Sequence, residues 1–337
     1  MKKKNIIIIA EAGVNHNGSL KLAKKLIDAA KDSGCDFIKF QSFKAENLVK
    51  SNLNIIGYQK KNMKKNIKQF KMLKKLEFNE SQLIKIINYC KRKNISFMSS
   101  PFDLESLETL FKLKIKDIKI ASGELTHYPL LKKIASSAKR IFLSTGMSNS
   151  KEIRSAIKVL LKNGADKNKI FLLHCHSDYP TKFEDVNLQA LKLLEEKFKL
   201  QVGYSDHTLG METSIAAIAL GATVIEKHIT INNKMEGPDH LASMEIKNLK
   251  HFVRSLRNTE KLLGRKIKVP TRRELKIKKW VRKSIVAKIS IKKDTIFSNE
   301  NIICKRPEGG LSPFKWDQVI GKKAKRSFKK DEFIKLK

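Results

Sequence analysis

The stretch LQVGYSDHTLGMETSIAAIALGATVIEKHI (200–229) decides the fold. Residues 200–207 and 222–228 have the short apolar and β-branched composition of strands, and the segment between them has that of a helix. Two strands joined by a helical crossover are parallel neighbours in one sheet, so both end at the same edge. We therefore expect the side chains at the two strand ends to lie close together.

Both of these strands end with a histidine. Side chains alternate between the faces of a strand, so Ser205 and His207 share one face of the first strand. Glu226 and His228 share one face of the second strand in the same way. Two neutral imidazoles at one edge suit a borderline divalent ion such as Mn²⁺ or Zn²⁺, with carboxylates or waters completing the shell. Two histidines that only cap or pack are the alternative, and the matching strand ends favour the metal site.

The alternation of strand-like and helical segments extends from Ile6 to about Leu263. The expected strands are 6–13, 36–41, 95–100, 117–123, 140–146, 169–175, 200–207 and 222–228. Eight such units predict a closed (β/α)8 barrel with its active site at the carboxyl ends of the strands. An open doubly wound sheet is the alternative, which eight regular repeats disfavour.

The composition of the chain changes after residue 263. Residues 264–282 are basic and lack the periodicity of the barrel, which is typical of a linker. Residues 283–337 contain short alternating apolar runs separated by turns. They predict a small, mostly β domain near the lower size limit for independent stability. The expected organisation is therefore a barrel domain over 1–263, a linker and this second domain.

One connection within the expected barrel is unusually long, from Phe43 to Leu76, and it is rich in lysine and asparagine. Long connections in compact domains are mostly functional lids or mobile segments. The sequence predicts a flap over the mouth of the barrel, with a disordered insertion as the alternative.

The formal net charge of the 337-residue chain is +38, which raises the question of a nucleic-acid or membrane partner. Only 11 of the 71 basic residues are arginine, and the lysines are spread through every segment. This distribution differs from an arginine-rich stripe with interleaved aromatic residues, so we expect no nucleic-acid partner. A basic surface still favours anionic metabolites.

The four cysteines indicate a reducing compartment. Cys35, Cys90, Cys175 and Cys304 have neither disulfide nor Cys-x-x-Cys spacing, so a cytoplasmic protein is expected. The apolar run after the N-terminal lysines is too short to span a bilayer and meets Glu11 at once. No signal peptide or membrane anchor is predicted.

Polar residues gather at the ends of the expected strands, where a purely structural barrel has no use for them. They are Glu11, Lys39, Gln41, Ser99, Ser100, Lys119, Ser122, Glu124, Ser144, Thr145, Ser177, Tyr179, Ser205, His207, Glu226 and His228. Two lysines with several hydroxyl groups suit a phosphorylated anion, reinforced by backbone N–H groups at helix starts. For any single residue, a satisfied polar group at the barrel rim is the alternative.

Three other histidines are weaker candidates. His174 and His176 flank Cys175 on one expected strand and look like a metal site, but few carboxylates are nearby, so a structural role is favoured. His16 lies in an Asn- and Gly-rich turn, where local hydrogen bonding and substrate contact are equally compatible with the sequence.

Ordered motifs along the whole chain resemble the sialic acid synthase family. They are AEAGVNHNG (10–18), DFIKFQSF (36–43), SSPFD (99–103), KIASGE (119–124), STGM (144–147), GYSDHT (203–208), IEKHIT (225–230), GPDH (237–240) and KRPEGG (305–310). The resemblance implies an enzyme, a C–C bond-forming transferase. It would join phosphoenolpyruvate to an N-acetylated mannosamine-type sugar and release phosphate by C–O cleavage, yielding a nonulosonic acid.

The resemblance also implies an architecture and roles for individual residues. It implies a TIM barrel followed by a small antifreeze-like (SAF) domain, in a domain-swapped homodimer whose small domain caps the partner's barrel. The implied metal ligands are His207 and His228, with Mn²⁺ favoured over Mg²⁺ or Co²⁺. The implied contacts to phosphoenolpyruvate are Lys39, Lys119, Ser122, Ser144 and Ser205. The implied sugar and catalytic contacts are Glu11, Gln41, Glu124, Tyr179 and Asp239, with Arg306 reaching in from the partner's cap.

Family members that form N-acetylneuraminate have Asn where this chain has Ser177, two residues before Tyr179. The segments KFQSFKAENL, MLKKLE and GELTHYPLL resemble instead the members that make N,N'-diacetyllegionaminic acid from a 2,4-diacetamido-trideoxy sugar. That product is favoured, with N-acetylneuraminate as the alternative. A Schiff-base aldolase, a 3-deoxy-sugar-acid synthase and a catalytically inactive sugar- or ice-binding protein are the other classes considered.

Overall fold

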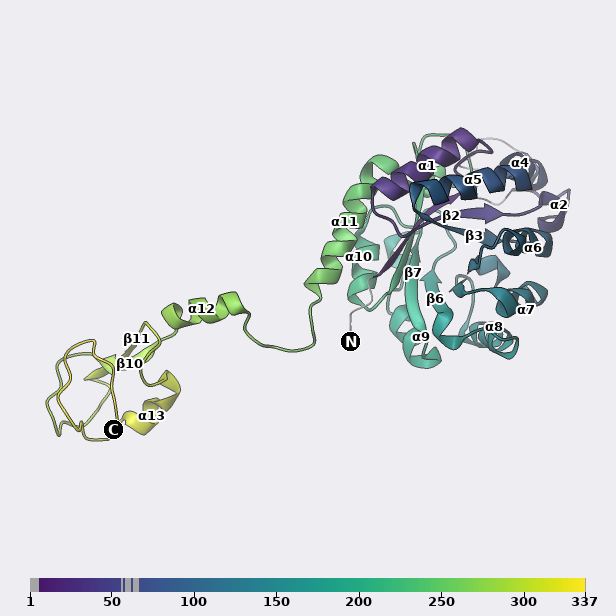
Figure 1. Cartoon of the computed structure of the whole chain (residues 1–337). Coiled ribbons are helices and arrows are strands. Elements are labelled where there is room, and N and C mark those ends of the chain that lie inside the picture. The colour runs from purple at the N-terminus through teal and green to yellow at the C-terminus, as the bar shows by residue number, and fades with distance from the viewer. Residues whose placement is uncertain (1–5, 56, 58–61, 63–66, 337) are drawn as a thin grey trace. The chain divides into compact units, whose positions relative to one another are not determined.

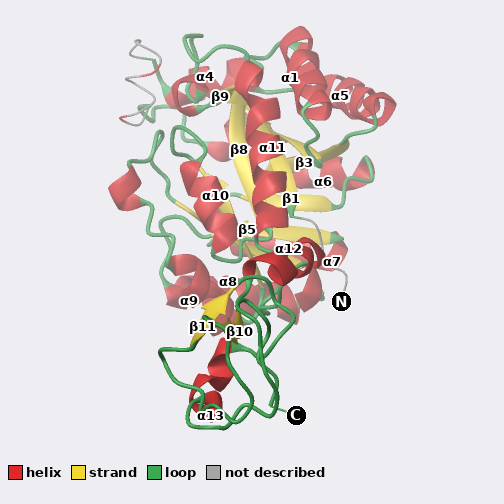
Figure 2. Ribbon diagram, turned by 90° about the vertical axis from the view of Figure 1, so that its left-hand side faces the viewer, coloured by secondary structure: helices red, strands yellow, loops and turns green. Residues whose placement is uncertain are grey.

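The computed structural model describes residues 6–55, 57, 62 and 67–336. Eight parallel strands pair in sequence order, and β1 pairs with β8, which closes the sheet into a barrel ringed by helices (Figures 1 and 2). The strands are β1 (Ile7–Gly13), β2 (Phe37–Ser42), β3 (Ser96–Pro101), β4 (Asp117–Ile120), β5 (Arg140–Ser144), β6 (Ile170–Cys175), β7 (Gln201–Asp206) and β8 (Val224–Thr230). The predicted (β/α)8 barrel is confirmed, and the open doubly wound sheet is wrong.

Helix α1 illustrates how an outer helix is capped and packs one apolar face against the barrel. The hydroxyl of Ser19 accepts a hydrogen bond from the backbone N–H of Leu22 and caps the helix, and the residues with helical apolar spacing are buried against the barrel. Gly34 follows with a φ of +83°, a conformation that favours glycine. The helices of this layer are α1 (Leu20–Asp32), α5 (Glu80–Lys93), α6 (Leu104–Lys112), α7 (Tyr128–Ser137), α8 (Ser150–Lys162), α9 (Ala190–Phe198), α10 (Glu212–Ala219) and α11 (Ile246–Leu262).

The inside of the barrel is apolar at one end and polar at the other. An apolar layer fills the half nearest the amino ends of the strands and consists of Ile9, Phe37, Met98, Phe142, Phe171, Leu173 and Val224. Two or more residues further along the same strand faces lie the polar groups Glu11, Lys39, Ser100, Ser144 and Glu226. The alternation of side chains along each strand therefore places polar groups only near the carboxyl ends.

The long connection after β2 is partly helical. It contains α2 (Ala45–Leu48) and α4 (Gln69–Leu76), whose apolar side chains form a small cluster with Val14 and Phe43. Residues 56, 58–61 and 63–66 of the predicted flap lie outside the described residues. The sequence did not predict the short strand β9 (Met244–Glu245), which pairs with β8.

The chain divides into two compact units, Met1–Gly264 and Arg265–Lys337. In the second unit, β10 (Ser284–Ala287) and β11 (Ile302–Lys305) form an antiparallel pair over a core that includes Phe297 and Phe328. The stretch predicted as a linker contains α12 (Arg272–Val281), and the short α13 (Trp316–Val319) follows later. Within the ranges that the structure describes, no helix is both long and apolar enough to cross a membrane.

Candidate active site

The carboxyl ends of the barrel strands open into a cavity of about 390 Å³. It brings together all barrel residues for which the resemblance implies a binding, catalytic or metal role: Glu11, Lys39, Gln41, Lys119, Ser122, Glu124, Ser144, Tyr179, Ser205, His207, His228 and Asp239. Of the other polar residues predicted at strand ends, Ser100, Ser177 and Glu226 also line the cavity, whereas Ser99 and Thr145 donate to the backbone carbonyls of Phe40 and Leu173. Arg306 is exposed in the second unit. Residues spread over more than 220 positions of sequence thus share one cavity because they occupy equivalent places at strand ends.

Four buried charged side chains form the bottom of the cavity, and we call them the floor cluster: Glu11, Lys39, Lys119 and Glu226. The ammonium nitrogen of Lys39 lies 3.0 Å from Oε1 of Glu11 and 3.6 Å from Oε1 of Glu226. Lys119 donates to the same Glu226 oxygen at 3.0 Å. Ser100 and Ser205 complete the cluster with hydrogen bonds to Lys39 (3.1 Å) and Glu226 (2.9 Å).

Burial and mutual attraction set the charges of the floor cluster. Burial raises the pKa of Glu11 to about 7, against the opposing attraction of Lys39. Burial also acts against the charge of Glu226, but the attraction of Lys119 and Lys39 outweighs it and holds this pKa well below its usual range. Burial also disfavours the charged form of Lys39, but attraction to Glu11 and Glu226 outweighs this effect and raises the pKa of Lys39. For Lys119, burial lowers the pKa. With Glu11 partly protonated near neutral pH, the cluster has an excess of positive charge and suits an anion.

Several buried polar atoms in the cavity have no hydrogen-bond partner among the described residues. They are Oε2 of Glu11, Oε2 of Glu226, Oγ of Ser144 and Nδ1 of His228. A buried polar group without a partner costs about 1–3 kcal/mol, so such groups are rare unless a ligand or water satisfies them. Their concentration here indicates a binding site for a polar ligand.

His207 and His228 lie side by side at the edge of the floor cluster, with ring centroids 5.4 Å apart. Nδ1 of His207 donates to the carbonyl oxygen of His176 at 2.5 Å, which leaves Nε2 as an acceptor. Nε2 accepts from the hydroxyl of Tyr179 at 3.2 Å, and it lies 3.3 Å from the oxygen of Ser205, whose proton is donated to Glu226. Burial lowers the pKa of His207 to about 4 and lowers that of His228 well below its usual range, so both rings are neutral.

This donor arrangement fits a divalent metal ion with open coordination positions. The carbonyl oxygen of His176 fixes the tautomer of His207, as the hydrogen-bond partners of metal-binding histidines do, and Nδ1 of His228 has no partner among the described residues. Across residues 6–55, 57, 62 and 67–336, no group of three or more His, Cys, Asp or Glu side chains could hold a metal ion. Two imidazoles would therefore be the protein's share of the shell, with water or substrate oxygens supplying the rest.

Two further carboxylates line the wall of the cavity. Glu124 accepts a hydrogen bond from Nδ1 of His127 at 2.8 Å, and burial raises its pKa. Burial alone raises the pKa of Asp239 to about 6. Ser243 donates to the backbone carbonyl of Asp239 at 2.6 Å and receives a hydrogen bond from the Asn15 amide, which fixes this loop.

An Asp239→Asn variant is expected to be more stable than the wild type above pH 6. The folded protein binds this proton more tightly than the unfolded chain, so the carboxylate's contribution becomes less favourable as pH rises from about 4 to about 6. The asparagine removes this penalty, and we expect the free energy of unfolding to increase by about 3 kcal/mol at pH 7.5. Urea unfolding at pH 7.5 and pH 4 tests this, because the gain should vanish at pH 4; an equal gain at both values contradicts it.

The structure places the remaining candidates as follows. His174 lies away from the two-histidine site, with Nε2 at 2.8 Å from the carbonyl of Val186. His16 is buried against Phe78, and its Nδ1 accepts from the backbone N–H of Gly18. Glu226, at the centre of the floor cluster, was absent from the predicted binding and catalytic roles, although its shared strand face with His228 was the signal for it.

Comparison with known proteins identifies the family. Residues 26–268 match the NeuB family, and residues 282–337 match the SAF domain. The chain is 50% identical to the N,N'-diacetyllegionaminic acid synthase of Campylobacter jejuni, covering 98% of this chain and 99% of that protein. It is 43% identical to the same-named synthase of Legionella pneumophila, covering 93% of this chain and 89% of that protein.

Solved structures agree with this assignment. The N-acetylneuraminic acid synthetase of Leptospira borgpetersenii superposes with a TM-score of 0.71 at 32% identity, covering 81% of this chain and 90% of that one. The family match spans most of the barrel, including both histidines and the lysines of the floor cluster. The chain belongs to the NeuB family, with a C-terminal SAF domain.

Proposed function

We propose that this protein joins phosphoenolpyruvate to a 2,4-diacetamido-trideoxy sugar and releases phosphate, forming N,N'-diacetyllegionaminic acid. The observation that carries the proposal is the positively charged floor cluster directly beside two neutral imidazoles. The first suits an enol phosphate, and the second suits the carbonyl end of an open-chain sugar. The 50% identity to the Campylobacter jejuni synthase supports the choice of sugar.

The floor cluster binds and orients phosphoenolpyruvate in this proposal. Lys39 and Lys119 pair with its phosphate and carboxylate, and the hydroxyl of Ser144, which has no partner within the described ranges, donates a further hydrogen bond. His207 and His228 would hold a divalent ion, for which we favour Mn²⁺, and this ion would supply Lewis-acid polarisation of the sugar aldehyde when bound. C3 of phosphoenolpyruvate forms a bond to the aldehyde carbon with the electrons of the C2–C3 π bond, which leaves C2 cationic. The aldehyde oxygen gains a proton from a carboxyl group of the cavity wall, such as Glu124 or Asp239, whose pKa values are raised.

The second half of the reaction needs a base. Water adds to the cationic C2 and gives up a proton, and the tetrahedral intermediate loses phosphate by C–O cleavage. Glu11 is suited to accept that proton because its pKa is about 7 and its Oε2 has no partner among the described residues. Glu124 and Asp239 are the other carboxylates that can stabilise the cation or move protons.

Phosphate release in the presence of phosphoenolpyruvate and sugar tests the proposed function. The 2,4-diacetamido-trideoxy sugar and N-acetylmannosamine are compared side by side, with Mn²⁺ and after chelation. We expect Mn²⁺-dependent release with the diacetamido sugar and slower release with N-acetylmannosamine. No release with either sugar overturns the proposal, and borohydride trapping of a lysine with substrate indicates an aldolase instead.

We also propose a cytoplasmic, domain-swapped homodimer. The support comes from α12, whose side chains Leu275, Ile277, Trp280 and Val281 are not covered by the rest of the second unit. Exposed apolar groups on one short helix are typical of a surface that a partner covers. In the dimer, Arg306 of the SAF domain would complete the sugar site of the other subunit.

Co-expression of two impaired variants tests this exchange. Arg306→Ala should weaken use of the sugar while leaving the KM for phosphoenolpyruvate unchanged, and His228→Ala should abolish turnover. Mixed dimers contain one intact site, so random assembly should restore about a quarter of the wild-type rate. If the arginine acts within its own chain, the mixture will be no more active than the average of the two variants.

A further inference from the structure

One side of the cavity is lined by apolar side chains, in contrast to the charged floor. We call these residues the apolar wall: Val14, Leu48, Val49, Met72, Leu73, Leu76 and Phe102. They come from α2, α4 and the loops after β1 and β3, and most belong to a hydrophobic cluster separate from the main core. Leu48, Val49 and Leu73 are only half-buried, so part of their surface faces the cavity.

A single polar group interrupts the apolar wall. Gln69, the first residue of α4, lines the same cavity, and its Oε1 is buried with no hydrogen-bond partner among the described residues. An orphan amide among methyl and methylene groups is complementary to another amide that carries a methyl group. An acetamido substituent has that composition. A hydroxyl group has no methyl group to contact the apolar wall, and on burial there it would lose hydrogen bonds to water that the wall only partly replaces.

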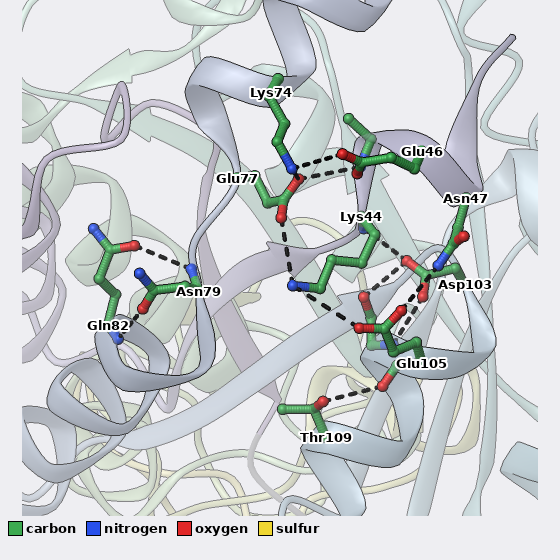
Figure 3. A network of polar contacts seen from close by, with 12 residues as sticks. Lys44, Glu46, Asn47, Lys74, Glu77, Asn79, Gln82, Asp103, Glu105 and Thr109 are labelled. Atoms are coloured by element: carbon green, nitrogen blue, oxygen red, sulfur yellow. Dashed lines mark hydrogen bonds and ion pairs between the residues drawn. The ribbon is translucent and has the colours of Figure 1, made fainter. Parts of the chain in front are cut away.

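Ion pairs and hydrogen bonds link the segments that carry the apolar wall (Figure 3). Lys44 contacts Glu77 at 3.4 Å, and its backbone N–H donates to Asp103 at 2.8 Å. Lys74 contacts Glu46 at 2.8 Å and Glu77 at 3.2 Å, which ties α4 to α2. The wall is thus organised before any ligand binds, as a specificity subsite requires.

We propose that Gln69 and the apolar wall form the subsite for the second acetamido group of the sugar. This inference rests on the proposed function, which places the enol phosphate on the floor cluster and the aldehyde beside the histidines. The rest of the open-chain sugar must then extend toward the walls. The subsite distinguishes a diacetamido sugar from N-acetylmannosamine, which carries a hydroxyl in place of the second acetamido group.

The experiment measures kcat/KM for both sugars by phosphate release in Gln69→Leu. Losing the hydrogen bond should lower kcat/KM for the diacetamido sugar by about ten- to hundredfold. The value for N-acetylmannosamine should change by less than about threefold, and the KM for phosphoenolpyruvate should stay constant. Leu73→Ala removes part of the apolar wall. It should lower the ratio of kcat/KM for the diacetamido sugar to kcat/KM for N-acetylmannosamine by about tenfold.

Matched controls separate this effect from general damage. Gln189→Leu changes an exposed glutamine at the start of α9, and Leu53→Ala changes an exposed leucine in the same long connection. Both control variants should leave the ratio of kcat/KM for the two sugars within about twofold of the wild-type ratio. Equal losses for both sugars in Gln69→Leu, or no loss for either, overturn the subsite. A wild type that prefers N-acetylmannosamine overturns the subsite and the proposed choice of sugar but leaves the condensation with phosphoenolpyruvate standing. A wild type that uses neither sugar overturns the proposed function as a whole, and the subsite with it.

Discussion

His228→Ala is expected to fold normally and to lose about a thousandfold in phosphate release, because Lewis-acid polarisation contributes several kcal/mol to the transition state. The imidazole lies 5.4 Å from that of His207, and its Nδ1 has no partner among the described residues, so no hydrogen bond is broken there. Calorimetric titration with Mn²⁺ should show greatly weakened binding. His207→Ala should behave alike, with the added loss of contacts to Tyr179 and Ser205.

The matched control is His251→Ala, which removes an exposed imidazole from α11. It should retain wild-type Mn²⁺ affinity and turnover. Unchanged activity in His228→Ala after chelation would refute the metal assignment. A variant that binds Mn²⁺ normally but fails to turn over would assign His228 a role other than metal binding.

Asp206→Ala is expected to cost about 3–5 kcal/mol of stability, because it leaves a buried lysine without its counter-ion. Asp206 and Lys227 are almost completely buried on the outer faces of β7 and β8, with 3.0 Å between their charged atoms. The aspartate also accepts hydrogen bonds from the Thr213 and Ser214 hydroxyls in the first turn of α10. The pair therefore links β7, β8 and α10 on the outer side of the strands that end at the two histidines.

Thermal unfolding should show this loss as a decrease in melting temperature of about 10 °C. Glu80→Ala is the control, because its ion pair with Lys112 at 3.0 Å is exposed and should contribute less than about 1 kcal/mol. Replacing a buried ion pair with apolar residues often leaves the stability unchanged or raises it. The double variant Asp206→Leu/Lys227→Met should therefore recover much of the lost stability. A loss in Asp206→Ala no larger than in Glu80→Ala would contradict a stabilising role.

The barrel and the neighbouring histidines were predictable because both depend on periodicity. Eight strand–helix repeats define the fold, and alternation along β7 and β8 determines which side chains face inward. For the same reason Lys39 and Lys119 could be assigned to one cavity from strands far apart in sequence.

Other parts of the site depend on distances in the folded protein that the periodicity of the sequence does not reveal. The Asp206–Lys227 pair and the position of Glu226 between two lysines follow from strand registers and burial, which pair the ends of β7 and β8 in three dimensions. Gln69 belongs to the long connection, whose conformation comes from its packing against the barrel rather than from any repeat. The shifted pKa values of Glu11 and Asp239 arise mainly from desolvation, so composition alone could not reveal them.

The apolar layer inside the barrel lies below the floor cluster. It separates the residues that stabilise the fold from those that bind the substrate, two requirements that often conflict in enzymes. The residues that secure folding, such as Phe142 and Phe171, precede the reactive groups on the same strand faces. Mutagenesis of cavity residues near the strand ends, outside the floor cluster, the serines assigned to phosphoenolpyruvate and the two histidines, can therefore explore new aldoses while the apolar layer beneath remains intact. Directed evolution of this scaffold toward other acidic sugars should begin at those positions.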